Sequence, residues 1–172
     1  MRDYAPFPVC VAQSLDYVCQ RYALELDEAQ RMSLLQRYAD APAFEDARSG
    51  LEAARSAGWR LLAFSNGTAE AVGHLLDNAG IAEFFVDVVS CDEVRSFKPN
   101  PEVYAHFLKR ANATGGDTWM ISSNPFDVLG AMHAGMQAAW VNRPGGASWD
   151  PWGLEPSVTV GDLTQLVGAL PA

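Results

Sequence analysis

The chain has 172 residues, of which 49% are apolar, and a net charge of −9 from 12 basic and 21 acidic residues. This length and composition predict one compact domain, or a domain with a small appendage, around a buried core. The acidic balance argues against nucleic acid and against an anionic membrane surface as partners, because both are bound through clustered Lys and Arg.

The sequence also lacks the signals of a membrane protein or an exported one. No apolar run approaches the roughly 20 residues that span a bilayer. Asp3, Pro6 and Pro8 stand where a signal peptide needs an apolar core. The odd number of three cysteines, without framework spacing, favours reduced and buried thiols over a redox role. We therefore expect a cytoplasmic protein with no membrane partner.

Two amphipathic helices with no strand between them are expected first. Apolar residues recur at helical spacing over Pro8–Leu24, and Asp27 with Gln30 resembles a capping box that opens the second helix. The pair predicts a helical hairpin over residues 1–41, separate from an α/β part over residues 42–172.

Helices and strands alternate through the α/β part. The expected strands are Arg60–Ser65, Val86–Ser90, Thr118–Ser122, Gln137–Val141 and Val158–Val160. Helices are expected over about 46–57, 69–79 and 126–134, and from Pro101 onward. This alternation predicts a Rossmann-like parallel sheet with helices on both faces. In such sheets, ligands bind at the carboxyl ends of the strands.

Ser65 and Asn66 follow the first strand and precede a helix. Free backbone N–H groups and the helix dipole favour an anion at such a place. The alternative is simple N-capping of the helix by Asn66 or Thr68.

Lys98, Tyr104 and Asp127 follow the next two strand ends. A lysine held extended by Pro99 can pair with a buried carboxylate such as Asp127, and the Tyr104 hydroxyl can reach the same crevice. The alternatives are that Lys98 is a solvated loop lysine, that Tyr104 is a core aromatic and that Asp127 only stabilises a helix dipole. The three histidines lie on different expected helices without metal-ligand spacing.

Three motifs in this order resemble those of a known family. They are Phe-Ser-Asn-Gly-Thr at 64–68, Ser-Phe-Lys-Pro-Asn-Pro-Glu-Val-Tyr at 96–104 and Ser-Ser-Asn-Pro-Phe-Asp at 122–127. Together they resemble the later motifs of the haloacid dehalogenase superfamily and are similar to those of the type II (S)-2-haloacid dehalogenases. The resemblance covers essentially the whole chain, and residues 1–41 resemble the second part of the helical cap in that family.

The resemblance implies a substrate class and a role for each matching residue. A small 2-haloacid would be hydrolysed to a 2-hydroxy acid of inverted configuration through an aspartyl-ester intermediate. Ser65 would bind the substrate carboxylate, and Asn66 would line the halide pocket. The other implied site residues are Lys98 and Tyr104 in the catalytic network, Ser122, Asn124 and Asp127 around the nucleophile and water, and Phe126 and Phe7 in the apolar wall.

The same resemblance bears on cofactors. Phosphatase relatives hold Mg²⁺ with acidic residues, commonly a Gly-Asp pair where this chain has Ser123-Asn124. Amide and hydroxyl groups suit a metal-free site better than carboxylates do, because Mg²⁺ favours carboxylate oxygens. We therefore expect no metal and no other cofactor.

One motif of the family is missing from the sequence. The nucleophile lies at the end of a strand in Asp-x-x-Gly-Thr, and no Asp before Phe64 follows an apolar strand. The Arg expected to hold the halide is absent as well, so the chain is expected to begin inside the cap. In the family fold the missing strand is central. Without it, Leu61–Ser65 and Thr118–Ser122 either pair directly or leave backbone groups unpaired at about 1–3 kcal/mol each.

Three hypotheses about function remain open. The first is a dehalogenase sequence that starts too late, and the second is a Mg²⁺-dependent phosphatase relative. The third is a non-catalytic remnant or a fragment that binds a partner, which an exposed apolar strip at the place of the missing strand would favour. We expect this chain to be inactive alone. Its oligomeric state stays open, with a homodimer among the allowed states.

Overall fold

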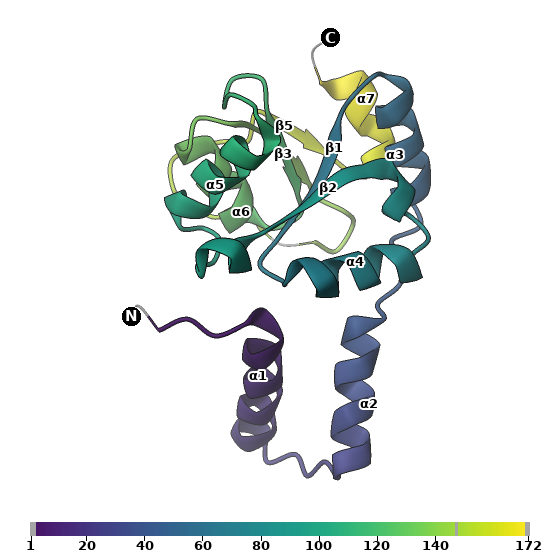
Figure 1. Ribbon diagram of the computed structural model, residues 1–172, viewed down its shortest axis with the longest axis vertical. Coiled ribbons are helices and arrows are strands. Elements are labelled where there is room, and N and C mark those ends of the chain that lie inside the picture. Colours follow the sequence, from purple (N-terminus) through teal and green to yellow (C-terminus); the bar gives the residue numbers. More distant parts are fainter. Residues whose placement is uncertain (1–2, 147, 171–172) are drawn as a thin grey trace.

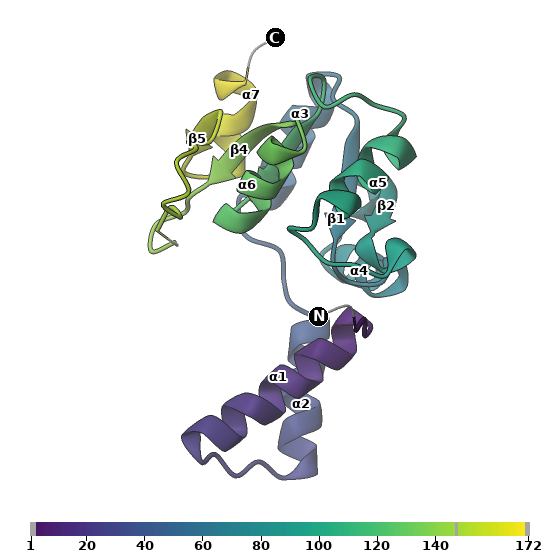
Figure 2. The same ribbon diagram turned by 90° about the vertical axis from the view of Figure 1, so that its left-hand side faces the viewer.

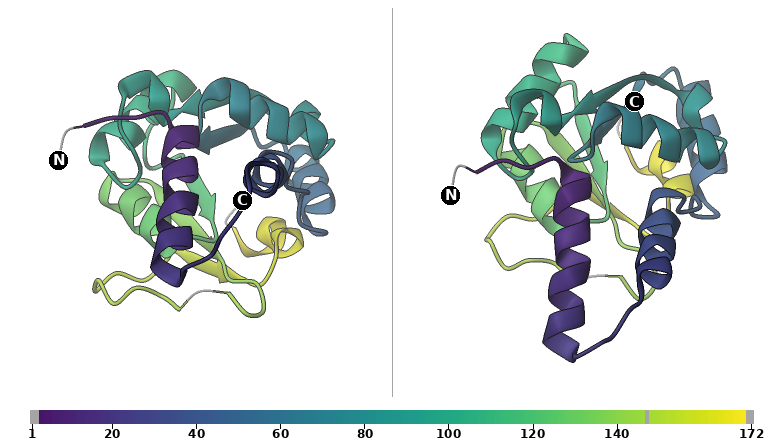
Figure 3. Two further views of the ribbon diagram at one scale, coloured as in Figure 1. Left: turned by 90° about the horizontal axis from the view of Figure 1, so that it is seen from below. Right: turned by 60° about the horizontal axis from the view of Figure 1, so that its bottom comes forward.

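The computed structural model describes residues 3–146 and 148–170 (Figure 1). Helices α1 (Phe7–Tyr22) and α2 (Glu28–Ala39) form a hairpin that projects from the rest of the molecule (Figures 1 and 3). No residue of either helix is buried. In the part of the chain that the structure describes, none of the helices combines the length and apolar character that a membrane span requires.

Local interactions hold the hairpin in shape. The expected capping box is present, because the Asp27 carboxylate accepts from Gln30 N at 2.8 Å and Gln30 Oε1 accepts from Asp27 N at 3.0 Å. Arg31 on α2 donates to Asp16 on α1 at 2.9 and 3.1 Å. Large apolar side chains of both helices remain exposed, among them Tyr22, which is 68% exposed. The amphipathic faces predicted from the sequence therefore form without being covered.

The hairpin contacts the rest of the protein at its two ends. Next to α1, the rings of Tyr4 and Phe7 pack on Phe97, with centroids 5.2 and 6.2 Å away. After α2, the carboxylate of Asp40 lies 2.9 Å from Nε2 of His74. These contacts place the start of α1 beside the residues that precede Lys98 in the chain.

The α/β part contains two parallel sheets. The first pairs β1 (Leu61–Ser65) with β2 (Phe85–Ser90). The second has the order β3-β4-β5, with β3 (Trp119–Ser122), β4 (Gln137–Val141) and β5 (Val158–Val160). We predicted a single sheet. Among the described residues β1 and β3 do not pair, which is the second of the two outcomes expected without a central strand.

A helix follows each strand except β4, which a loop joins to β5. The α-helices of this part are α3 (Ala47–Ser56), α4 (Ala69–Asn78), α5 (Pro101–Ala111), α6 (Pro125–His133) and α7 (Leu166–Ala169). Short 3₁₀ helices are η1 (Ala82–Phe84), η2 (Cys91–Val94) and η3 (Leu163–Gln165). The parallel strands with their helices confirm the predicted α/β class (Figure 2).

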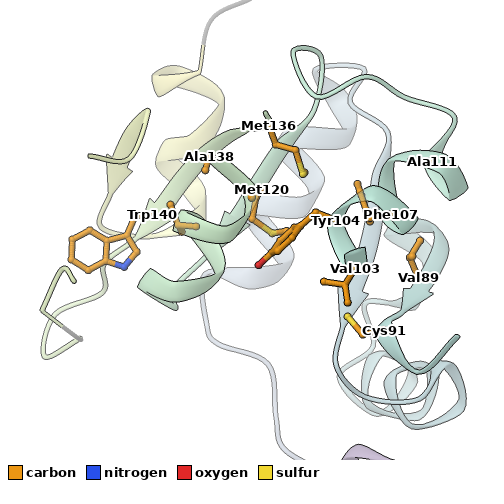
Figure 4. Packing of buried hydrophobic residues seen from close by; sticks show 12 residues of the cluster. Val89, Cys91, Val103, Tyr104, Phe107, Ala111, Met120, Met136, Ala138 and Trp140 are labelled. Atoms are coloured by element: carbon orange, nitrogen blue, oxygen red, sulfur yellow. The ribbon is translucent and has the colours of Figure 1, made fainter. Parts of the chain in front are cut away.

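The main core lies under α5 and α6 and contacts both sheets. Tyr104, Val103 and Val128 are fully buried there, and Met120 of β3 belongs to the same cluster (Figure 4). A smaller cluster joins β4 and β5 to α7. The two sheets therefore share one core with α5 and α6, although their strands do not pair with each other.

Strand β1 is unusually open for its composition. Its sequence Leu-Leu-Ala-Phe-Ser is typical of a buried parallel strand, yet all five residues are only partly buried. By contrast, four of the five residues of β4 are buried, because β4 has a neighbouring strand on each side. The exposure of β1 follows from its pairing with β2 alone among the described residues.

Asp46 connects three distant segments, and its replacement tests this connection. Its carboxylate accepts from Arg143 at 2.7 and 3.1 Å and from Leu163 N at 2.8 Å. The hydrogen bonds from Arg143 hold the pKa of Asp46 below its usual range. A lowered folded-state pKa stabilises the protein above the unfolded pKa of about 3.9, and this stabilisation is lost as pH falls through the folded pKa.

We therefore expect Asp46→Asn to lower the free energy of unfolding by about 1–3 kcal/mol at pH 7. The deficit should be smaller at pH 3, because the carboxylate of the unfolded wild-type chain is largely protonated there and part of the stabilisation is lost. Urea unfolding at both pH values measures the difference. Asp77→Asn, at an exposed position of α4, is the control and should change stability by less than about 0.5 kcal/mol. An Asp46→Asn deficit that is equal at both pH values would contradict the expectation.

Candidate functional site

A cavity of about 860 Å³ lies between the two sheets. Residues of β1 and β3 line it from opposite sides, with Leu61, Leu62, Met120 and Ile121 among them. Polar side chains gather where the two strands end, namely Ser65, Asn66, Lys98, Ser122, Asn124 and Asp127. The cavity therefore combines an apolar body with a polar end at the carboxyl ends of the strands, while Arg60, Asp117 and Thr118 line it near the amino ends.

Lys98 joins the carboxyl ends of the two strands. Its Nζ donates to the carbonyl of Phe64 at 2.8 Å and to Oδ2 of Asp127 at 3.1 Å. The side chains of Lys98 and Asp127 are each 7% exposed. Nζ also lies 3.9 Å from the centroid of the Phe64 ring. The structure thus has a buried positive group that is held at the carboxyl ends of both strands by two hydrogen bonds and an aromatic ring.

Tyr104 holds the second oxygen of Asp127. The hydroxyl donates to Oδ1 at 3.0 Å from a side chain that is fully buried. Burial, with the adjacent Asp127 carboxylate, raises the pKa of Tyr104 well above its usual range, so the hydroxyl stays protonated and remains a donor. Both oxygens of Asp127 are therefore engaged, and its orientation is set by two side chains.

The alternative roles of Ser65 and Asn66 can now be compared. Thr68 caps α4, because its hydroxyl accepts from Ala71 N at 3.2 Å. Asn66 instead accepts from the backbone N–H of Lys98 at 2.8 Å, and Ser65 Oγ accepts from Gly67 N at 3.0 Å. Asn66 therefore positions Lys98, and helix capping does not explain it.

The remaining candidates lie around the same opening. Ser122 Oγ accepts from Asn124 N at 3.2 Å at the start of α6. Phe126, which is 41% exposed, and Phe7 of α1 both line the cavity. Of the nine candidate residues, Tyr104 alone is absent from the lining, because it lies behind Asp127. The structure thus brings the predicted set together.

Among the described residues, no group of three or more His, Cys, Asp or Glu is placed to hold a metal ion. His74 and His106 lie against acidic side chains, at 2.9 Å from Asp40 and 3.0 Å from Glu93. At the polar end of the cavity the carboxylate is that of Asp127, which pairs with Lys98.

Sequence reasoning missed the short helix η2, which begins at Cys91. Ser90 and Glu93 form a capping box for η2, a signal that was present in the sequence. Cys91 is fully buried, whereas Cys10 and Cys19 are partly exposed. Burial raises the pKa of the Cys91 thiol to about 11.

The cysteines should therefore differ in reactivity. At pH 8 we expect a thiol-exchange reagent to modify Cys10 and Cys19 readily and Cys91 only on unfolding, because the thiolate is the reactive form. Spectrophotometric titration of native and urea-unfolded protein measures this. Cys91→Ala, the matched control, should remove the slow thiol and leave the fast ones. Equal rates for all three thiols would contradict the buried placement.

Comparison with known proteins agrees with this geometry. The protein-family model of the haloacid dehalogenase-like hydrolases matches residues 10–135 of this chain. (S)-2-haloacid dehalogenase 2 of a Pseudomonas species is 34% identical over 99% of this chain and 74% of that protein.

Solved structures show the same likeness. One L-2-haloacid dehalogenase superposes with a TM-score of 0.91 at 28% identity, over 96% of this chain and 72% of its own. Another, from Xanthobacter autotrophicus with chloropropionic acid covalently bound, superposes with a TM-score of 0.86 at 27% identity, over 95% and 75%. The chain belongs to the haloacid dehalogenase-like hydrolases, and its relatives include (S)-2-haloacid dehalogenases.

Proposed function

We propose that the site serves the hydrolytic dehalogenation of small (S)-2-haloacids. The observation that supports this most is the Lys98–Asp127–Tyr104 network at the polar end of a cavity between two strand ends. A fixed ammonium group next to a small apolar cavity can orient carboxylates and stabilise developing negative charge. The covalently bound chloropropionic acid in a related structure supports a covalent route.

The proposed reaction has two steps. An aspartate carboxylate attacks C2 from the side opposite the halogen, so that a C–O bond forms while the C–halogen bond breaks and halide leaves. Water then adds to the ester carbonyl and forms a tetrahedral intermediate. Its collapse breaks the C–O bond between the carbonyl carbon and the 2-hydroxy acid, releases that acid, restores the aspartate carboxylate and yields one proton. One inversion at C2 gives a product of opposite configuration.

The residues of this chain would share the supporting roles. Ser65 would hold the substrate carboxylate, Asn66 would line the halide pocket, and Lys98 would orient the attacking carboxylate. Ser122, Asn124 and Asp127 would position that carboxylate and the water, while Tyr104 would hold Asp127 in place. Phe126 and Phe7 would form the apolar wall.

The attacking carboxylate itself would come from outside this set. Asp127 is held by Lys98 and Tyr104 through both oxygens, which leaves it oriented as a supporting group. We therefore propose that the 172-residue chain does not turn over by itself.

Joining the chain to a segment that supplies the carboxylate tests the function. The segment is an N-terminal apolar strand that ends in Asp-x-x-Gly-Thr, followed by the Arg-bearing cap helix. The joined protein should release chloride from (S)-2-chloropropionate and form the inverted 2-hydroxy acid, without added Mg²⁺. Asp→Asn in the added strand should abolish release. Release of phosphate from an ester only with Mg²⁺ would favour the phosphatase hypothesis and contradict the proposal.

A further inference from the structure

We propose that Tyr4 is a positioning residue for Lys98 and acts through the 91–97 segment, which leads from β2 to that lysine. Tyr4 lies before α1 of the helical hairpin, whereas Lys98 lies in the α/β part. The proposal therefore couples the place of the hairpin to the buried cation of the site. The part of Lys98 in dehalogenation rests on the proposed function, but the coupling is measured without turnover.

Tyr4 contacts three residues of the 91–97 segment. Its hydroxyl donates to Oδ1 of Asp92 in η2. The guanidinium carbon of Arg95 lies over the Tyr4 ring, 5.3 Å from its centroid. The ring of Phe97 stacks on that of Tyr4 with centroids 5.2 Å apart and an angle of 28° between the planes. A hydrogen bond, a cation–π contact and a ring stack therefore converge on one side chain.

The hydroxyl of Tyr4 is a lasting donor in this arrangement. Burial and the hydrogen bond to Asp92 raise the pKa of Tyr4 to about 12. The hydroxyl therefore stays protonated at neutral pH, and its bond to the carboxylate persists. A hydrogen bond to a charged acceptor is stronger than one between neutral groups.

The 91–97 segment transmits the constraint to Lys98. It is bonded to itself, since the backbone N–H of Arg95 donates to the carbonyl of Asp92 at 3.0 Å. Phe97 directly precedes Lys98, whose own backbone N–H donates to Oδ1 of Asn66 at 2.8 Å. A displacement of the Tyr4 contacts would therefore move a short, internally bonded loop that ends at the lysine.

Phe97 also receives a second ring from the hairpin. The ring of Phe7 on α1 packs on it with centroids 6.2 Å apart, and Phe7 lines the same cavity as Lys98. Tyr4 and Phe7 thus contact one ring that directly precedes the lysine in the chain. The Tyr4 contacts therefore set the place of an apolar wall residue relative to the cation of the site.

The other end of the hairpin provides a matched contrast. Asp40 follows α2, and its carboxylate lies 2.9 Å from Nε2 of His74 on α4. Among the described residues, neither of these two side chains has a hydrogen bond or an ion pair with residues 91–98. Loosening this end frees the hairpin without touching the segment that leads to Lys98.

The lysine content makes the coupling measurable in the full chain. The sequence has two lysines, Lys98 and Lys109. The side chain of Lys98 is 7% exposed, whereas Lys109 is exposed on α5. Limited acetylation of the folded protein, followed by peptide mass spectrometry, gives the ratio of their labelling rates within one molecule. A buried amine reacts through local openings, so this ratio reports how firmly Lys98 is held.

We expect Tyr4→Leu to raise the Lys98 to Lys109 labelling ratio about tenfold or more, because the stack, the cation–π contact and the hydrogen bond are all lost. Tyr4→Phe keeps the ring and should restore part of the protection, with a rise of about three- to fivefold. His74→Ala and Tyr17→Leu, the latter at a 66% exposed position of α1, should change the ratio by less than about twofold.

A second measurement separates local loosening from unfolding. In protein labelled with ¹⁵N-lysine, two backbone amide signals are expected, and that of Lys98 should exchange faster in Tyr4→Leu than in the parent. Hydrogen exchange of the buried strand β4 should stay unchanged, because β4 reports on the core.

Three outcomes would overturn the proposal. They are an unchanged labelling ratio in Tyr4→Leu, an equal rise in His74→Ala, and an equal acceleration of exchange in β4, which would indicate general unfolding. Chloride release is no readout here, so failure of the dehalogenation proposal remains a separate result.

Discussion

Replacement of Lys98 by Met is expected to lower the free energy of unfolding by about 3–5 kcal/mol, because it leaves the carboxylate of Asp127 buried without its cation. Both side chains are 7% exposed, and Lys98 also bonds the Phe64 carbonyl at 2.8 Å. Urea unfolding followed by circular dichroism measures the loss. Part of this loss of unfolding free energy is the cost of leaving the Asp127 charge unpaired, and a second substitution measures that part.

The separation uses a second substitution. Asp127→Asn removes the negative charge and keeps an oxygen that can accept from Tyr104, so the double variant should be more stable than Lys98→Met alone. Lys109→Met, at an exposed position of α5, is the matched control and should stay within about 0.5 kcal/mol of the parent. If Lys98→Met is as stable as Lys109→Met, the ion pair is not buried as described.

The second large effect is expected from Gly130→Ala, which should destabilise the protein by about 3 kcal/mol or more. A Cβ at Gly130 would meet the Tyr104 ring, with Cζ at 2.7 Å and Cε2 at 2.8 Å, and would contact the hydroxyl oxygen as well. The ring is fully buried and packs edge-on against Phe64, so it cannot move away freely. The substitution therefore overpacks the core and displaces the hydroxyl from Asp127.

Gly73→Ala provides the control for the change of Gly to Ala in a helix. Gly73 lies within α4, and a Cβ there meets nothing within 4 Å. Ala is the better helix former, so this variant should gain about 0.5–1 kcal/mol. Thermal unfolding of the two variants in parallel decides the point. Equal effects would show that helix propensity, and not contact with Tyr104, governs Gly130.

Local signals in the sequence predicted much of the fold. Asp27 and Gln30 form their capping box, and β4 has the predicted bounds Gln137–Val141. These features depend on residues a few positions apart, for which helix capping and hydrophobic pattern carry the information. The motif order likewise predicted that Lys98 and Asp127 share one crevice, because parallel strands end at one edge of a sheet.

Features that depend on distant residues were beyond these signals. Arg143 pairs with Asp46 across 97 positions, and neither residue stands in a pattern that indicates the other. The partial exposure of β1 does not follow from its own apolar sequence, which is that of a buried strand; only the missing nucleophile motif indicated that its edge could stay unpaired. Gly130 is similar, because only packing against Tyr104 explains a glycine inside α6.

Chloride release from (S)-2-chloropropionate by the purified 172-residue chain is the most direct test of the proposed site. We expect no release above the rate in buffer, because Ser65, Lys98 and the engaged Asp127 cannot supply the attacking carboxylate. Ion chromatography over a long incubation, with the joined protein as a positive control, gives the required sensitivity. Release by the unmodified chain above the rate in buffer would place the nucleophile within these residues and contradict the proposed site.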